Sequence, residues 1–180
     1  FGSFQIHGLT GDNETLESIV KHTISNHFKE CNGSEFPIIE WAKEVAKTTA
    51  EMIAHWMRVG FVHGVMNTDN MSIHGLTIDY GPYGWLEDYS PAWTPNTTDK
   101  SHRRYRYGNQ PQIGAWNVAR FLEAISPLVE NKDELQAVLE IYISRYEECS
   151  DSMWGAKLGM NEFTKEDLSL IHISEPTRRP

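Results

Sequence analysis

Three polar side chains near the middle of the chain have the types and spacing of a magnesium and phosphate site. Asp69 and Asn70 are adjacent, and Asp79 follows nine residues after Asn70. Oxygen ligands suit Mg²⁺, which usually takes one or two carboxylates from a protein and fills its other positions with phosphate oxygens and water. We therefore expect Asn70 and Asp79 to hold Mg²⁺, which leaves Asp69 available to act as a base.

A simpler interpretation is that Asp69 and Asn70 only cap a turn, a position that both residue types favour. An isolated Asp-Asn pair would favour that interpretation. The pair lies within a longer run, residues 63–81, that carries glycines, β-branched residues and a second carboxylate. This run favours the site over the turn.

The elements that must position these residues are mostly helices. Apolar residues recur at three- and four-residue spacing in four segments, which predicts amphipathic helices. These segments are residues 13–29, 37–60, 111–127 and 133–149. Between the second and third helices, the pieces 71–73 and 76–78 predict two short strands around a turn at His74-Gly75. Such a hairpin would bring Asn70 and Asp79 together at adjacent strand ends.

The segment 80–110 contains prolines, glycines and several aromatic residues without a helical period, which predicts a long ordered loop. The predicted fold class is therefore mainly α with a small β-hairpin. The order helix, helix, hairpin, long loop, helix, helix resembles the C-terminal lobe of a protein kinase-like fold.

Composition limits the classes of partner. The chain has 180 residues, with 16 Lys and Arg against 25 Asp and Glu, for a formal net charge of −9. An acidic balance argues against nucleic-acid binding, which needs a clustered basic face. No apolar run approaches the roughly 20 residues of a membrane span, so we expect no membrane partner. Cys31 and Cys149 have no metal or disulfide spacing, which favours a reduced intracellular protein. We expect a cytoplasmic location, or a mitochondrial one in a eukaryote.

Both ends of the chain look non-native. It begins at Phe1 within an apolar-patterned segment, and we expect an upstream region to precede it. Residues 168–180 include a run that matches the translation of a transposase sequencing adapter, although a native terminal tail is the alternative. We therefore divide the chain into residues 1–167, a fragment of one domain that lacks its N-terminal half, and residues 168–180, a non-native tail.

Three groups of residues together resemble the selenoprotein O family. The central run from His63 to Gly81 is the most specific because of its length. Tyr83-Gly84 follows this run, and the two other groups are Phe1-Gly-Ser-Phe4 and the segment from Arg104 to Pro111 with Trp116-Asn117.

The resemblance implies a kinase-like fold that transfers AMP from ATP to Ser, Thr or Tyr hydroxyls of proteins. It also implies that Asp69 is the catalytic base, that Asn70 and Asp79 hold Mg²⁺, and that Asp79 approaches ATP. ATP and substrate proteins are the expected partners. Further ATP contacts in the family come from an upstream Lys and Arg residues, so we expect the 180-residue chain alone to be inactive.

The motif departs from an ordinary protein kinase, which places its base five residues ahead of the metal-binding Asn. Val65 stands where that Asp would be, so Asp69 is the only acid in the loop. The shifted acid leaves open an alternative function, a catalytically inert, pseudokinase-like domain that binds nucleotide or protein.

A histidine and a group of arginines are further candidates for the site, and each has a structural alternative. His63 is interpreted as a hydrogen-bonding support for the loop backbone rather than as a ligand. Arg103, Arg104 and Arg106 could face phosphates, since guanidinium groups bind them in a bidentate manner, or could form a solvated loop face.

Overall fold

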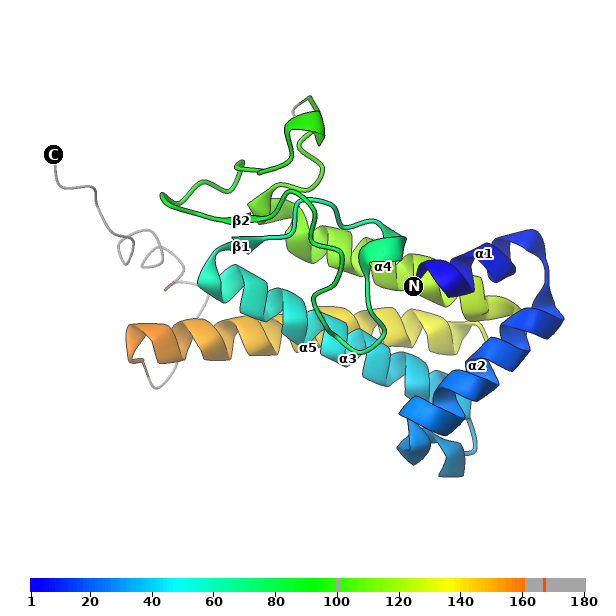
Figure 1. The fold of residues 1–180 in the computed structure, drawn as a ribbon. Coiled ribbons are helices and arrows are strands. Elements are labelled where there is room, and N and C mark those ends of the chain that lie inside the picture. Colours follow the sequence, from blue (N-terminus) through cyan, green and yellow to red (C-terminus); the bar gives the residue numbers. More distant parts are fainter. Residues whose placement is uncertain (100, 161–166, 168–180) are drawn as a thin grey trace, which may run out of the picture.

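The computed structural model describes residues 1–99, 101–160 and 167. Five α-helices form its framework: α1 (Gly2–Thr10), α2 (Asn13–His27), α3 (Pro37–Val59), α4 (Gln110–Ile125) and α5 (Asp133–Leu158) (Figure 1). Two strands, β1 (Phe61–Val62) and β2 (Gly84–Trp85), pair antiparallel, with Phe61 opposite Trp85. Short 3-10 turns connect these elements: η1 (Lys29–Gly33), η2 (Thr68–Asn70), η3 (Thr97–Asp99), η4 (Tyr107–Asn109) and η5 (Ser126–Leu128).

The core lies between α3 and its neighbours. Helix α3 has Pro37 at its start and ends at Gly60, whose left-handed φ of 70° suits a residue without a Cβ. Its apolar stripe includes Trp41 and Ile53, both fully buried. Phe4 of α1 packs on Trp41 in a tilted arrangement and Phe121 of α4 packs on it edge-to-face, with ring centroids 5.3 and 5.1 Å away. The central helix thus joins α1 to α4 through one aromatic cluster.

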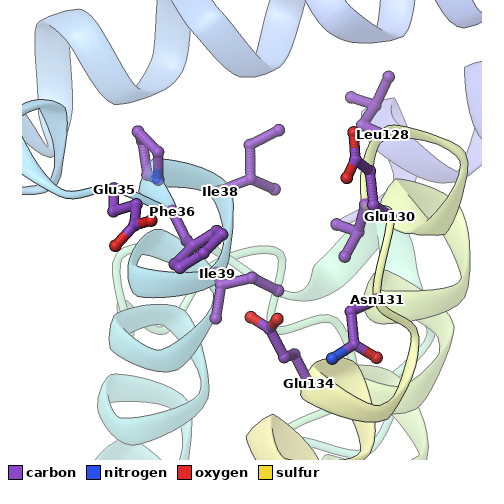
Figure 2. Close-up of a pocket in the computed structure, with 10 residues that line it drawn as sticks. Glu35, Phe36, Ile38, Ile39, Leu128, Glu130, Asn131 and Glu134 are labelled. Carbon is purple, nitrogen blue, oxygen red and sulfur yellow. The ribbon is translucent and has the colours of Figure 1, made fainter.

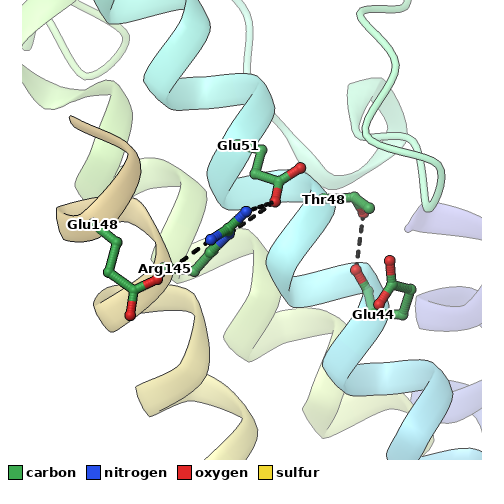
Figure 3. Close-up of polar contacts among 5 residues, drawn as sticks. All are labelled: Glu44, Thr48, Glu51, Arg145 and Glu148. Carbon is green, nitrogen blue, oxygen red and sulfur yellow. Dashed lines mark hydrogen bonds and ion pairs between the residues drawn. The ribbon is translucent and has the colours of Figure 1, made fainter. Parts of the chain in front are cut away.

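Helices α3 and α5 lie side by side and run in the same direction (Figure 1). Near the middle of both, Arg145 donates to Glu51 with its Nε at 2.8 Å and also pairs with Glu148 (Figure 3). At their ends, Lys157 donates to the Arg58 carbonyl oxygen. These contacts fix the register of the two longest helices.

The four helices predicted from periodicity are confirmed, with shifted ends. Helix α5 continues to Leu158, nine residues beyond the predicted end, while α2 ends at His27. Helix α1 was not predicted. The interpretation of residues 168–180 as a non-native tail lies outside the described residues.

The predicted hairpin at 71–78 is present only as a turn closed by a single bridge, and its two predicted strands are wrong. This segment forms one isolated antiparallel bridge, between Met71 and Thr77, and the paired strands are β1 and β2 instead. The segment lies on α3: Trp56 Nε1 donates to Thr77 Oγ1 at 2.9 Å, and Gly75 approaches the Thr48 backbone so closely that a Cβ would overlap it. Contacts with the helix, rather than strand pairing, set the path of this backbone.

The long loop between residues 80 and 110 is ordered by its own hydrogen bonds. Asp99 accepts from the Tyr105 N–H at 2.8 Å, and the Tyr107 N–H donates to the Trp93 carbonyl oxygen at 2.9 Å. In the parts of the chain that the structure describes, no helix combines the length and apolar composition that a membrane crossing requires.

Candidate active site

The loop that leads from β1 to Asp69 is held by buried amide side chains. Gln110 donates to the Phe61 carbonyl oxygen and accepts from the His63 N–H, at 2.9 and 3.0 Å. Asn96 donates to the Gly64 carbonyl oxygen at 3.0 Å, and Asn117 donates to that of Met66 at 2.9 Å. These buried carbonyl groups receive their hydrogen bonds from side chains, as buried backbone groups outside regular pairing require.

Asp69 lies at the mouth of a small hollow. The hollow has a volume of about 270 Å³, and its walls are the first turn of α1, the segment from Met71 to Ile73, and Ile78. The Asp69 side chain is exposed, and no hydrogen bond from the described residues holds its carboxylate. Its oxygen atoms therefore remain accessible to solvent.

The Asn70 side chain is oriented by a hydrogen bond from its amide nitrogen. Its Nδ2 donates to the Val65 carbonyl oxygen at 2.9 Å. No hydrogen bond within the described part of the chain engages its Oδ1. An amide fixed in this way presents its oxygen as a possible metal ligand.

Asp79 is exposed and has a left-handed backbone with φ of 48°. Arg103 is the other non-glycine residue with positive φ in the described ranges. Asp tolerates this conformation better than most residues, yet such backbones concentrate at functional sites. The conformation is compatible with a ligand role, although no described contact joins Asp79 to Asn70.

His63 connects the loop to the residue before Asp79. It is fully buried, and its Nε2 lies 2.8 Å from the Ile78 carbonyl oxygen. Because a carbonyl can only accept, Nε2 carries the proton, and Nδ1 can accept the longer contact from the Val65 N–H at 3.4 Å. Burial lowers the pKa of His63, and the Ile78 carbonyl and Asp79 oppose that shift in part. The structure gives His63 the supporting role that the sequence predicts.

The arginine cluster makes contacts within the chain. The Arg104 guanidinium stacks on the Trp116 ring at 4.6 Å, and Arg106 donates to the Arg103 carbonyl oxygen at 3.1 Å. Arg103 and Arg104 are exposed. A contact with phosphate groups stays a prediction.

The described residues contain no cluster of three or more His, Cys, Asp or Glu side chains that could hold a metal ion. Two protein oxygens from Asn70 and Asp79 would be a sparse set for most metals. They suit Mg²⁺, which keeps several waters and binds substrate phosphates.

A larger hollow, of about 350 Å³, lies elsewhere, between the starts of α3 and α5. Figure 2 shows Glu35 and Ile38 on one side of it, Leu128 and Glu130 on the other, and Glu134 below. It contains none of the predicted site residues.

Sequence reasoning missed the role of three residues, Asn96, Gln110 and Asn117. All three are at least nine-tenths buried. Gln110 and Asn117 lie within the motifs that resemble the family, which was a signal for them, whereas Asn96 lies in a polar stretch that gave none.

Comparison with known proteins identifies the family. A family model described as protein adenylyltransferase SelO matches residues 1–176. The chain belongs to the SelO family. A protein nucleotidyltransferase YdiU of Rhodopirellula baltica is 52% identical over 97% of this chain and 35% of its own length. Proteins of the same name from Xanthomonas campestris and Flavobacterium johnsoniae are 52% and 48% identical, each over 95% of this chain and 33% of their own length.

The chain thus spans about a third of the length of these SelO relatives. The resemblance stated from the sequence motifs is confirmed. The family match covers the loop with Asp69, the segment with Asp79, and all the amides that hold the loop.

Proposed function

We propose that the longer protein to which this chain belongs transfers AMP from ATP to Ser, Thr or Tyr hydroxyls of proteins, with Mg²⁺. The observation that carries the proposal is the exposed Asp69 carboxylate, which lines a hollow and has no hydrogen-bond partner among the described residues. Membership of a family described as protein adenylyltransferase supports this direction. We also propose that the helical framework is the C-terminal lobe of a kinase-like fold.

The proposed step is a displacement at the α-phosphorus of ATP. The acceptor oxygen forms a bond to that phosphorus, the bond to the bridging oxygen of the β-phosphate breaks, and pyrophosphate leaves. Asp69 takes the hydroxyl proton, a role worth about 10²- to 10⁴-fold in rate. Asn70 Oδ1 and the Asp79 carboxylate would hold Mg²⁺, which neutralises charge on the phosphate oxygens.

The test is Asp69→Asn in the full-length protein. We expect AMP incorporation into protein to fall by about 10²- to 10⁴-fold, because the amide cannot accept the proton, while the affinity for ATP changes little. Incorporation is measured with α-labelled ATP, and affinity by calorimetry.

Asp133→Asn is the matched control, since Asp133 is exposed at the start of α5 and distant in sequence from the loop. Undiminished incorporation by Asp69→Asn would refute the assigned base. ATP binding without any incorporation by the parent protein would instead support the inert, pseudokinase-like alternative.

A further inference from the structure

The first turn of α1 lies directly against Asp69. Gly2 is buried, and a Cβ added to it would overlap Asp69 Oδ1 and lie 3.2 Å from the Asp69 Cα. Only a residue without a side chain leaves room for the carboxylate in its present place. The contact joins two segments 67 residues apart in the chain, so local sequence does not produce it.

One turn further along α1, Gln5 holds the residue before Asp69. Thr68 Oγ1 donates to Gln5 Oε1 at 2.5 Å. Thr68 is buried and begins η2, the turn that contains Asp69 and Asn70. Asn70, on the other side of Asp69, is held by its bond to Val65. Both neighbours of Asp69 are therefore fixed although its carboxylate is not.

The other end of α1 is fixed to α4. A Cβ added to Gly8 would lie 2.5 Å from the Ala124 carbonyl oxygen and 2.8 Å from the Ala124 Cα, so the two backbones are in close contact. Phe4 packs on Phe121 of the same helix, with ring centroids 5.7 Å apart. Gly2, Gln5 and Gly8 recur every three residues, which places them on neighbouring positions of one helical face.

We propose that α1 is a brace that positions the base: Gly2 and Gln5 are positioning residues that set where the Asp69 carboxylate lies. This inference rests on the proposed function, because it assigns roles relative to the base. The physical reason is that no hydrogen bond from the described residues holds the carboxylate, so its position follows from the contact with Gly2 and from the turn that the Thr68–Gln5 and Asn70–Val65 bonds fix. Misplacement of a reacting group by about 1 Å can cost on the order of 100-fold in rate.

The test uses Gly2→Ala, Gln5→Met and Thr68→Val in the full-length protein. We expect kcat for AMP transfer to fall by about 10- to 100-fold, while KM for ATP changes by less than about twofold, because the variants move the base and leave the nucleotide site. Thr68→Ser, which keeps the hydroxyl, should restore most of kcat. A merely structural role would lower the amount of folded enzyme without this separation of kcat from KM and without rescue by Ser.

Two matched controls separate the brace from general effects of substitution. Gly33→Ala adds a Cβ where no atom lies within 4 Å, and Gln136→Met changes an exposed residue of α5. Both should leave kcat unchanged. Wild-type kcat in Gln5→Met and Thr68→Val would overturn the proposal even if Gly2→Ala fails to fold.

The experiments distinguish failure of the α1 brace from failure of the proposed AMP transfer. If Asp69→Asn abolishes transfer and the Gln5 and Thr68 variants do not lower kcat, only the brace is refuted. If the wild-type protein transfers no AMP, amide hydrogen exchange still decides the brace. Exchange at Asn70 and Met71 should accelerate in Gln5→Met, and unchanged exchange there would refute it.

Discussion

At the scale of single residues, the candidate site depends on buried side chains that hydrogen-bond the backbone leading to Asp69 and do not themselves line the hollow. Gln110 and Asn117 are fully buried, and each satisfies a backbone carbonyl group of the loop before Asp69. Asp69 and Asn70 were selected from the sequence because they lie within the long run 63–81, and their catalytic and metal-binding roles stay predictions. The supporting amides could not, because an Asn or Gln in a sequence does not show which distant carbonyl it will meet.

We expect Gln110→Met to destabilise the fold. Met has a similar length, but it leaves the Phe61 carbonyl oxygen and the His63 N–H without their partner. An orphaned buried polar group costs about 1–3 kcal/mol. The free energy of unfolding of the 180-residue chain, measured in urea, should fall by at least this amount.

Gln136→Met, on the exposed face of α5, is the control and should change the free energy of unfolding by less than about 0.5 kcal/mol. Equal unfolding midpoints for the two variants would show that the Gln110 hydrogen bonds contribute nothing.

At the scale of elements, the helices were predictable and the strands were not. Helix α3 could be predicted from its own sequence, because its 23 residues carry an apolar stripe, Pro37 begins it and Gly60 follows its last residue. The segment 71–78 has the β-branched residues of a hairpin, but its partner is α3, through Trp56 and Thr77. Strand pairing depends on tertiary neighbours, which a short apolar alternation does not specify. Helix α1 was missed since its glycines, which serve close contacts, weaken the helical pattern.

The packing of α4 against both α3 and α5 gives a prediction about these elements. A Cβ at Gly114 of α4 would overlap both Ile53 of α3 and the Tyr142 hydroxyl of α5, which donates to the Pro111 carbonyl oxygen at 2.9 Å. We expect Gly114→Ala to lower the free energy of unfolding by about 1–3 kcal/mol, the usual cost of overpacking. Ala is the better helix former, so the sign of the change distinguishes packing from intrinsic propensity.

Gly33→Ala, at an open position outside the helix crossing, is the comparison for thermal unfolding. If Gly114→Ala is as stable as the wild type, the neighbouring side chains of α3 and α5 move aside for the added methyl group with little loss of free energy, and the prediction is wrong.

At the scale of the whole molecule, stability against pH should have a maximum with different causes on its two sides. The pKa of His63 is lowered by burial, so below its ordinary pKa of about 6.5 the unfolded chain binds a proton that the folded chain does not. Stability therefore rises with pH in that range. Burial raises the pKa of the Cys31 and Cys149 thiols and of the Tyr142 and Tyr146 hydroxyls. At alkaline pH the unfolded chain loses these protons first, and stability falls.

The acid side can be assigned to one residue by a pair of variants. Between about pH 5.5 and about pH 7.5, the free energy of unfolding of the wild-type chain should increase with pH, and His63→Gln should flatten that increase. The amide can still donate to the Ile78 carbonyl oxygen, so the variant tests titration more than the loss of the bond. His102→Gln, at an exposed loop position, should keep the wild-type slope. If the free energy of unfolding of His63→Gln rises with pH as steeply as that of the wild type, the pH dependence comes from another group and not from the buried imidazole.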